Sequence, residues 1–149
     1  MDSVKGPEDG KTLLLDYQLP TRVEEIEKLA DAVNAALPGR SDLAFAANLC
    51  LEELVTNTIL HGLHGRPDRV IHIRLSLSEQ WLEITIKDDA PRFDPFTQVP
   101  KPELGLALDD RPIGGLGVHL VRTIMDDVRA YYDGTGNLIV LLKNLGGSS

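Results

Sequence analysis

The stretch Cys50–Gly62 (CLEELVTNTILHG) restricts the fold more than any other part of this chain. On a helix, where each residue turns by about 100°, Glu53, Asn57 and His61 fall on one side. The rest of the circumference is mostly apolar, and such a helix is typically buried. A buried carboxylate and amide need partners, because an unpaired polar group inside a protein costs about 1–3 kcal/mol. The stretch therefore predicts polar contacts within the core or a ligand site.

Three interpretations of Glu53 and Asn57 follow from their chemistry. In the first, they cap a neighbouring loop in the core. In the second, the carboxylate and the amide oxygen are hard ligands that suit Mg²⁺, which shares its coordination sphere with water and phosphate. In the third, Glu53 accepts a proton as a general base. These two residues alone do not distinguish the three interpretations, so the other motifs of the chain are needed.

The charge balance argues against one large class of function. The chain has 149 residues, 15 basic against 23 acidic, and a net charge of −8. A nucleic-acid-binding surface would show a basic stripe, so we expect a basic or neutral protein partner instead. A hydrophobic content of 42% and a charged content of 26% are typical of a globular chain, and the length suits one domain.

The single cysteine, Cys50, indicates a reducing compartment, because it has no partner for an internal disulfide. Its apolar neighbours favour a buried structural thiol. The sequence has no uninterrupted apolar run of 18 residues, and its N-terminus lacks the apolar region of a signal peptide. We therefore expect a soluble, cytoplasmic protein that contacts neither nucleic acid directly nor a membrane.

Five short runs have the composition of strands. Residues 12–19 form an apolar run, while residues 70–77 and 81–87 alternate between apolar and polar and predict an antiparallel pair. Residues 126–132 and 137–142, joined by a glycine-containing turn, predict a closing hairpin. Around this domain, 12–143, we expect a flexible N-terminal tail, 1–11, and a C-terminal tail, 144–149.

Two helices are expected between the first and second of these strands. Thr21 and Glu24 form a capping-box pattern before a run of apolar residues at helical spacing, which ends at Pro38. Ser41 or Asp42 is then expected to cap the helix that contains Glu53.

A long segment without helical or strand period, from residue 88 to Arg111, precedes a glycine cluster. Such a segment inside a compact domain is usually a lid or a binding loop, although a surface insertion is the simpler alternative. The sequence GGLG at 114–117 then opens a helix with Val118 in its apolar stripe. Glycines at a helix start leave the first amides approachable and favour an anion site, though a plain loop-to-helix junction has the same pattern.

The three motifs, taken in order, resemble those of a known family. ELVTNTILHG at 53–62 resembles the N-box of the GHKL (Bergerat-fold) ATPases, DDAPRFDP at 88–95 their second box, and RPIGGLGVHLVRTIMD at 111–126 their glycine box. The resemblance covers Thr12 to Lys143 and is greatest to the bacterial anti-sigma-factor serine/threonine kinases. It implies an α/β (α+β) two-layer sandwich, with a mixed, mostly antiparallel sheet and three helices on one face.

The resemblance also implies roles for single residues. Asn57 resembles the asparagine that binds Mg²⁺, and Glu53 the acidic residue that activates the attacking hydroxyl. Asp88 resembles the aspartate that binds the adenine amino group, with Ala90 beside it on the adenine side. His61 resembles the histidine that closes the N-box, where a structural role is expected.

The glycine box supplies the phosphate side of the implied ATP site. Its lid glycines, whose amides meet the phosphates, resemble Gly115 and Gly117. The implied nucleotide-binding segment comprises Gly114, Gly115, Leu116, Gly117 and Val118. Arg111, at the lid hinge, is placed to reach a phosphate.

The resemblance implies an ATP- and Mg²⁺-dependent kinase that phosphorylates an anti-sigma-factor antagonist, a small STAS-type protein, and sequesters a sigma factor. A homodimer is also implied. One departure supports an alternative, a partner-sequestering module without catalysis: Ala90 and Arg92 replace the glycines of the family's D-x-G-x-G box. A detached histidine kinase catalytic part is a third interpretation, but the chain has no room for the phospho-accepting helix pair.

Overall fold

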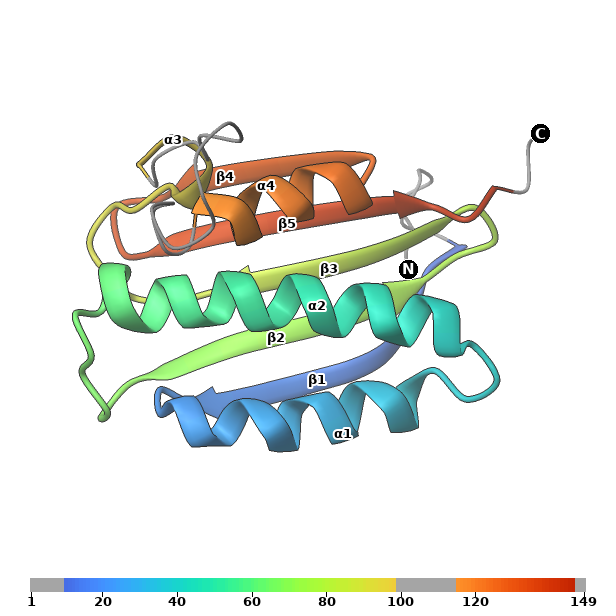
Figure 1. Ribbon diagram of the computed structural model, residues 1–149, viewed down its shortest axis with the longest axis horizontal. Coiled ribbons are helices and arrows are strands. Elements are labelled where there is room, and N and C mark those ends of the chain that lie inside the picture. Colours follow the sequence, from blue (N-terminus) through green and yellow to red (C-terminus); the bar gives the residue numbers. More distant parts are fainter. Residues whose placement is uncertain (1–9, 99–114, 147–149) are drawn as a thin grey trace, which may run out of the picture.

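The computed structural model describes residues 10–98 and 115–146, which form two layers (Figure 1). One layer is a five-stranded sheet of β1 (Thr12–Pro20), β2 (Val70–Leu77), β3 (Trp81–Lys87), β4 (Asp127–Tyr132) and β5 (Asn137–Asn144). The strands lie in the order β1-β2-β3-β5-β4, and every neighbouring pair is antiparallel. The expected α+β sandwich is confirmed, but the described strands form a sheet that is antiparallel throughout and not the mixed sheet that the resemblance implied.

The second layer consists of helices on one face of the sheet (Figure 1). A short 3₁₀ turn, η2 (Val23–Glu25), leads into α1 (Ile26–Ala36), and α2 (Ser41–Asn57) continues as a π-helical turn, η3 (Thr58–Gly62). The other helices are α3 (Pro95–Gln98) and α4 (Gly115–Ile124). The central helix, α2, packs against both α1 and α4.

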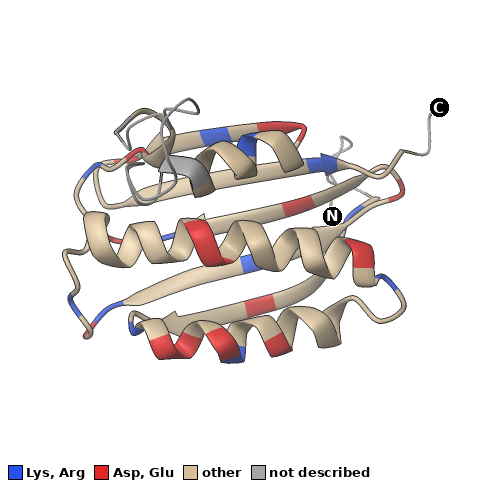
Figure 2. Cartoon of the chain, in the orientation of Figure 1, with Lys and Arg blue, Asp and Glu red and all other residues tan. Residues whose placement is uncertain are grey.

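The core lies between the sheet and α2. The alternating residues of β2 and β3 that face the helices are fully buried, as are Leu54 and Val55 of α2. Burying one such aliphatic side chain stabilises a fold by about 1.5–3 kcal/mol. Figure 2 shows α2 nearly free of charge except for acidic residues at its middle and its start. The helix predicted to be buried is therefore the centre of the core.

The segment Ser41–Gly62 also has the length and apolarity of a membrane span, with 22 residues and a mean hydropathy of 1.3. However, 61% of the window is buried inside the protein, as in the core helix of a globular domain. Burial raises the pKa of the Cys50 thiol on this helix to about 11. The thiol therefore stays protonated near neutral pH, which fits the expected structural role.

The capping box predicted at Thr21 and Glu24 is not formed. The Thr21 hydroxyl instead donates to the carbonyl of Arg66 at 2.7 Å and accepts from the amide of Arg69 at 3.1 Å. The α-helix begins only at Ile26, after the 3₁₀ turn. A long-range contact to the loop before β2 has replaced the local one.

The second cap prediction is also wrong. Ser41 and Asp42 lie inside the first turn of α2, the N-cap position is occupied by Arg40, and no side chain caps the helix there. The apolar face of α2 drives its burial, so its start does not depend on a side-chain cap.

Candidate functional site

Three segments that are distant in sequence meet at one end of the molecule (Figure 1). They are the C-terminal half of α2, the residues that follow β3, and the first turn of α4. The antiparallel order of the strands places the end of β3 next to the start of β5. These segments carry the three motifs on which the sequence prediction depended.

Glu53 on α2 lies directly against Gly117 in the first turn of α4. A Cβ atom built on Gly117 would lie 2.8 Å from Glu53 Cγ and closer still to its carboxylate atoms, so a side chain at position 117 would displace Glu53. The unpaired amides of a helix N-terminus carry partial positive charge and favour an anion. The structure thus brings a carboxylate to the turn where the resemblance implies phosphate binding.

The environment of Glu53 also alters its acidity. Burial, and to a smaller extent the negative charge of the neighbouring Glu52, raises the pKa of the Glu53 carboxyl above its ordinary value. A carboxylate with a raised pKa is a stronger base, which suits general-base catalysis near neutral pH.

Asn57, one turn after Glu53, is 4% exposed and lacks a complete set of partners. Within residues 10–98 and 115–146, nothing accepts a hydrogen bond from its Nδ2, and the buried Thr58 hydroxyl is likewise unpaired. A half-turn of the amide exchanges its nitrogen and oxygen, so the same site can present an oxygen ligand. With its oxygen turned to that side, the amide and the neighbouring carboxylate of Glu53 could hold a cation such as Mg²⁺, which prefers oxygen ligands.

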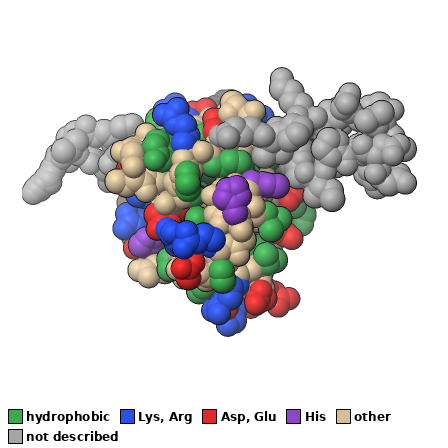
Figure 3. Space-filling view, turned by 90° about the vertical axis from the view of Figure 1, so that its left-hand side faces the viewer, with side chains coloured by type: hydrophobic (Ala, Val, Ile, Leu, Met, Phe, Trp, Pro, Cys, Tyr) green, Lys and Arg blue, Asp and Glu red, His purple; other side chains and the backbone are tan. Residues whose placement is uncertain are grey.

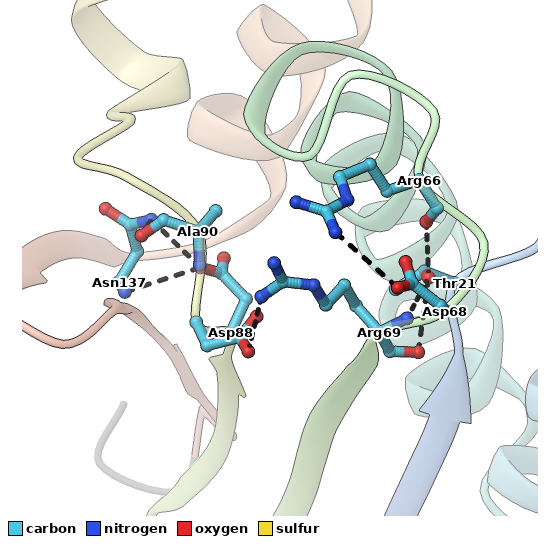
Figure 4. A network of polar contacts seen from close by, with 8 residues as sticks. Thr21, Arg66, Asp68, Arg69, Asp88, Ala90 and Asn137 are labelled. Atoms are coloured by element: carbon cyan, nitrogen blue, oxygen red, sulfur yellow. Dashed lines mark hydrogen bonds and ion pairs between the residues drawn. The ribbon is translucent and has the colours of Figure 1, made fainter.

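Asp88, directly after β3, is 6% exposed. Its Oδ1 accepts from the amide of Ala90 at 2.8 Å, from Nδ2 of Asn137 at 2.9 Å and from the amide of Asn137 at 3.4 Å (Figure 4). No donor to its Oδ2 occurs within the described part of the chain. One oxygen of Asp88 is therefore fully engaged, and the other is free to accept a hydrogen bond from a ligand.

The fold accommodates Ala90 and Arg92, which replace the two glycines of the second box, without backbone strain. Ala90 is buried, and the only non-glycine residue with positive φ in the described ranges is His64, so position 90 does not need a glycine. Arg92 is exposed, and its guanidinium lies 5.3 Å from the centre of the Tyr132 ring. The Arg92 side chain thus packs against the Tyr132 ring on β4 and stays out of the buried network around Asp88.

An open cleft of about 430 Å³ borders the second box on another side. It lies between the loop after η3, residues 89–91 and the β4–β5 turn, and Arg69 forms an ion pair with Asp89 across it at 2.8 Å. Figure 3 shows histidine and basic side chains at this end of the molecule. His61 is exposed, and its ring centre lies 6.3 Å from that of Phe93 in the second box.

The other predicted residues are placed as follows. Gly115 and Leu116 open α4, and the side chain of Val118 is buried in the core. Arg111 and Gly114 lie outside the described residues. The sequence did not single out Asn137 or Thr58, although a polar residue at the start of the apolar run NLIVLL was a usable signal.

A two-layer α+β sandwich with these three motifs at one end defines a histidine kinase-like ATPase domain. The chain belongs to this family, whose model matches residues 18–143.

The chain resembles curated proteins of anti-sigma regulation. It is 30% identical over 136 residues to the serine-protein kinase RsbW of Listeria innocua, covering 87% of this chain and 85% of the relative. It is 29% identical over 93 residues to the anti-sigma F factor of Halalkalibacterium halodurans, covering 62% and 63%. It is 32% identical over 83 residues to the serine/threonine-protein kinase BtrW of Bordetella bronchiseptica, covering 56% and 58%. The family expected from the motifs is confirmed.

Solved structures agree on the fold. The blue-light activated histidine kinase EL346 of Erythrobacter litoralis has a TM-score of 0.55 at 19% identity, covering 87% of this chain and 43% of that one. The histidine kinase AdeS of Acinetobacter baumannii has a TM-score of 0.51 at 14% identity, covering 90% and 69%.

Proposed function

We propose that this protein is an ATP-dependent protein serine/threonine kinase of the anti-sigma regulator type. The observation that supports it best is the Glu53 carboxylate lying against Gly117 at the first turn of α4. A base and a phosphate-binding helix terminus are thereby adjacent, and phosphoryl transfer depends mainly on such positioning. The kinase names of the relatives support the same activity.

Each residue contributes one function in this proposal. Glu53 takes the proton of the attacking serine or threonine hydroxyl. Asn57 holds Mg²⁺, which neutralises phosphate charge when bound. Asp88 accepts a hydrogen bond from the adenine amino group, and the amides of Gly115 and Gly117 bind phosphate oxygens. Leu116 and Val118 lie beside these amides.

The same proposal extends to Ala90, at the adenine side, and to Gly114 and Arg111, which lie outside the described residues. We place the catalytic domain at 12–143, with tails at 1–11 and 144–149. The substrate is a STAS-type anti-sigma-factor antagonist, and the second partner is a sigma factor that the protein sequesters. We further propose that the protein acts as a homodimer in the cytoplasm.

The decisive experiment is transfer of labelled phosphate from ATP to a panel of STAS-type proteins. Glu53→Gln should lower the transfer rate at least about 100-fold, as expected for loss of a general base, and retain Mg-ATP binding. Glu52→Gln, on the exposed adjacent position, is the matched control and should stay within a few-fold of wild type. Transfer by Glu53→Gln at the wild-type rate would exclude Glu53 as the base.

The same experiment tests the alternative function, a partner-sequestering module without catalysis. If the wild-type protein transfers no phosphate to any antagonist but still binds a partner, it is a sequestering module. The exposed position of Arg92 weakens the reason for that alternative, because the residue does not fill the buried network at Asp88.

A further inference from the structure

We propose that the open cleft of about 430 Å³ beside the second box is a docking site for an acidic segment of a protein partner. Its lining includes three side chains that can carry positive charge, those of His64, Arg66 and Arg69. Of the described residues to which the proposed function assigns a part, only Ala90 lines this cleft. The inference therefore goes beyond the proposed function and does not depend on it.

The segment that forms one wall of the cleft is a basic exception in an acidic chain. Residues 61–74 contain three arginines and three histidines but one carboxylate, that of Asp68, whereas the whole chain has 23 acidic against 15 basic residues. Figure 3 shows histidine and basic side chains together on this face of the molecule. The charge of the whole chain favours a basic or neutral partner. An acidic partner is repelled by that charge and is attracted by this segment.

The loop that carries the two arginines of the cleft is held by a buried threonine. The hydroxyl of Thr21, which is 1% exposed, donates to the carbonyl of Arg66 at 2.7 Å and accepts from the amide of Arg69 at 3.1 Å (Figure 4). The amide of Thr21 donates to the carbonyl of Arg69 at 3.1 Å. The loop is thus fixed at both ends. A loop fixed in this way loses little conformational freedom when a partner binds, which favours affinity.

The charges of these arginines are only weakly neutralised by their neighbours. Arg69 Nη1 lies 2.8 Å from a carboxylate oxygen of Asp89, and Arg66 Nη2 lies 3.5 Å from one of Asp68. Both carboxylates are exposed, so water and salt screen these pairs and they contribute little to stability. Within residues 10–98 and 115–146, each guanidinium pairs with a single carboxylate. Because a guanidinium has five N–H donors, both arginines can also bind carboxylates of a partner.

The arrangement of the cations suits an extended segment better than a compact anion. Arg66 and Arg69 pair with different carboxylates, and a third arginine, Arg92, lies over the ring of Tyr132 beside the β4–β5 turn, 5.3 Å from its centre. A compact anion such as phosphate is bound by donors that converge on it. Spaced cations instead match carboxylates spaced along a peptide. Tyr132 and Pro91 add apolar contact surface to the cleft, and tyrosine and arginine are enriched where proteins bind one another.

The test is the affinity of the full chain for a labelled peptide in which glutamate alternates with glycine, measured by fluorescence polarisation at low salt and without nucleotide. Wild type should bind it at least about tenfold more tightly than the matched peptide with glutamine in place of glutamate. The double change Arg66→Gln and Arg69→Gln should remove this preference. Arg66→Gln alone should weaken binding a few-fold at an unchanged thermal midpoint, because its side chain is exposed, and it decides the question if the double variant does not fold.

Two exposed arginines outside the cleft provide the matched control. Arg74 on β2 pairs with Asp16 at 3.5 Å, Arg129 on β4 pairs with Asp127 at 2.8 Å, and neither arginine lines the cleft. The double change Arg74→Gln and Arg129→Gln alters the net charge by the same amount. It should leave the preference for the glutamate peptide unchanged.

The inference is wrong if wild type binds both peptides equally, if the cleft variants bind like wild type, or if the control pair lowers the preference as much as the cleft pair does. Inorganic phosphate that displaces the glutamate peptide more strongly than chloride at the same ionic strength would assign the cleft to a compact anion instead. The measurement uses no nucleotide. Failure of docking and failure of phosphate transfer are therefore seen in separate experiments.

Discussion

At the residue scale, Gly117 is a position where adding one methyl group is expected to impair phosphate transfer strongly. Gly117→Ala places a Cβ where the Glu53 carboxylate lies, so Glu53 must move. Alanine raises helix propensity by about 1 kcal/mol over glycine, which offsets part of the steric cost. We expect a small change in thermal midpoint and a loss of phosphate transfer of at least about tenfold.

A double-mutant cycle with Glu53→Ala checks this interpretation. With the Glu53 side chain shortened, the three atoms that the new Cβ would meet most closely are gone, so Gly117→Ala should be neutral or stabilising. The two changes should therefore be non-additive in unfolding free energy, as expected for residues in contact. Additive effects would show that Glu53 and Gly117 do not touch in solution.

Some of these residues could be identified from the sequence and others could not. Glu53 and Asn57 stand out because they are polar residues on a helix that is otherwise apolar. Asn137 has the same character, but its importance depends on contacts with Asp88, which is 49 positions away. Local sequence patterns contain helical and strand periods; they do not contain the pairing of a strand with a distant loop.

At the scale of single elements, the β4–β5 turn allows a test of whether the negative charge of Asp133 stabilises the fold. Hydrogen bonds from the Thr135 hydroxyl and from the amides of Thr135 and Gly136 hold the pKa of Asp133 well below its ordinary value of 3.8. A carboxyl whose pKa is depressed in the folded state stabilises the fold above its unfolded pKa. This stabilisation is lost as the pH falls below about 4 towards the folded pKa.

Asp133→Asn should therefore lower the thermal midpoint by a few degrees at pH 7, and the difference from wild type should shrink at pH 2.5. Asp68→Asn is the matched control, because Asp68 is exposed and its only described contact is the ion pair with Arg66 at 3.5 Å. A deficit for Asp133→Asn that stays the same at both pH values would show that the charge of the carboxylate contributes nothing.

The elements themselves were predictable where one pattern dominates. Strands β2 and β3 have the bounds that alternation predicts, because one face is buried and the other is not. The start of α1 was not predictable, since Thr21 binds the loop at Arg66 and Arg69 instead of its own helix. Tertiary contacts thus override local capping signals where a helix meets a neighbouring loop.

At the scale of the whole molecule, the site is expected to link nucleotide binding to stability. Asn57 sits in the central helix and its Nδ2 has no described partner, so a ligand bound to this side chain would not have to break a hydrogen bond of that nitrogen. A ligand at about 100 times its dissociation constant stabilises a protein by roughly 2.7 kcal/mol. For a chain of 149 residues, this corresponds to a rise in thermal midpoint of about 5–10 °C.

Asn57→Ala should abolish this rise with Mg-ATP and leave the midpoint of the free protein nearly unchanged, because no described hydrogen bond of Nδ2 is lost. Asn48→Ala is the matched control, since Asn48 lies on the same helix and donates to Asn34 at 3.1 Å, away from the site. It should keep the full rise. The measurement is thermal unfolding with and without Mg-ATP, and with ATP when Mg²⁺ is chelated. A wild-type protein that gains no stability from millimolar Mg-ATP would not be a nucleotide-dependent kinase, and its partner binding would then be independent of nucleotide.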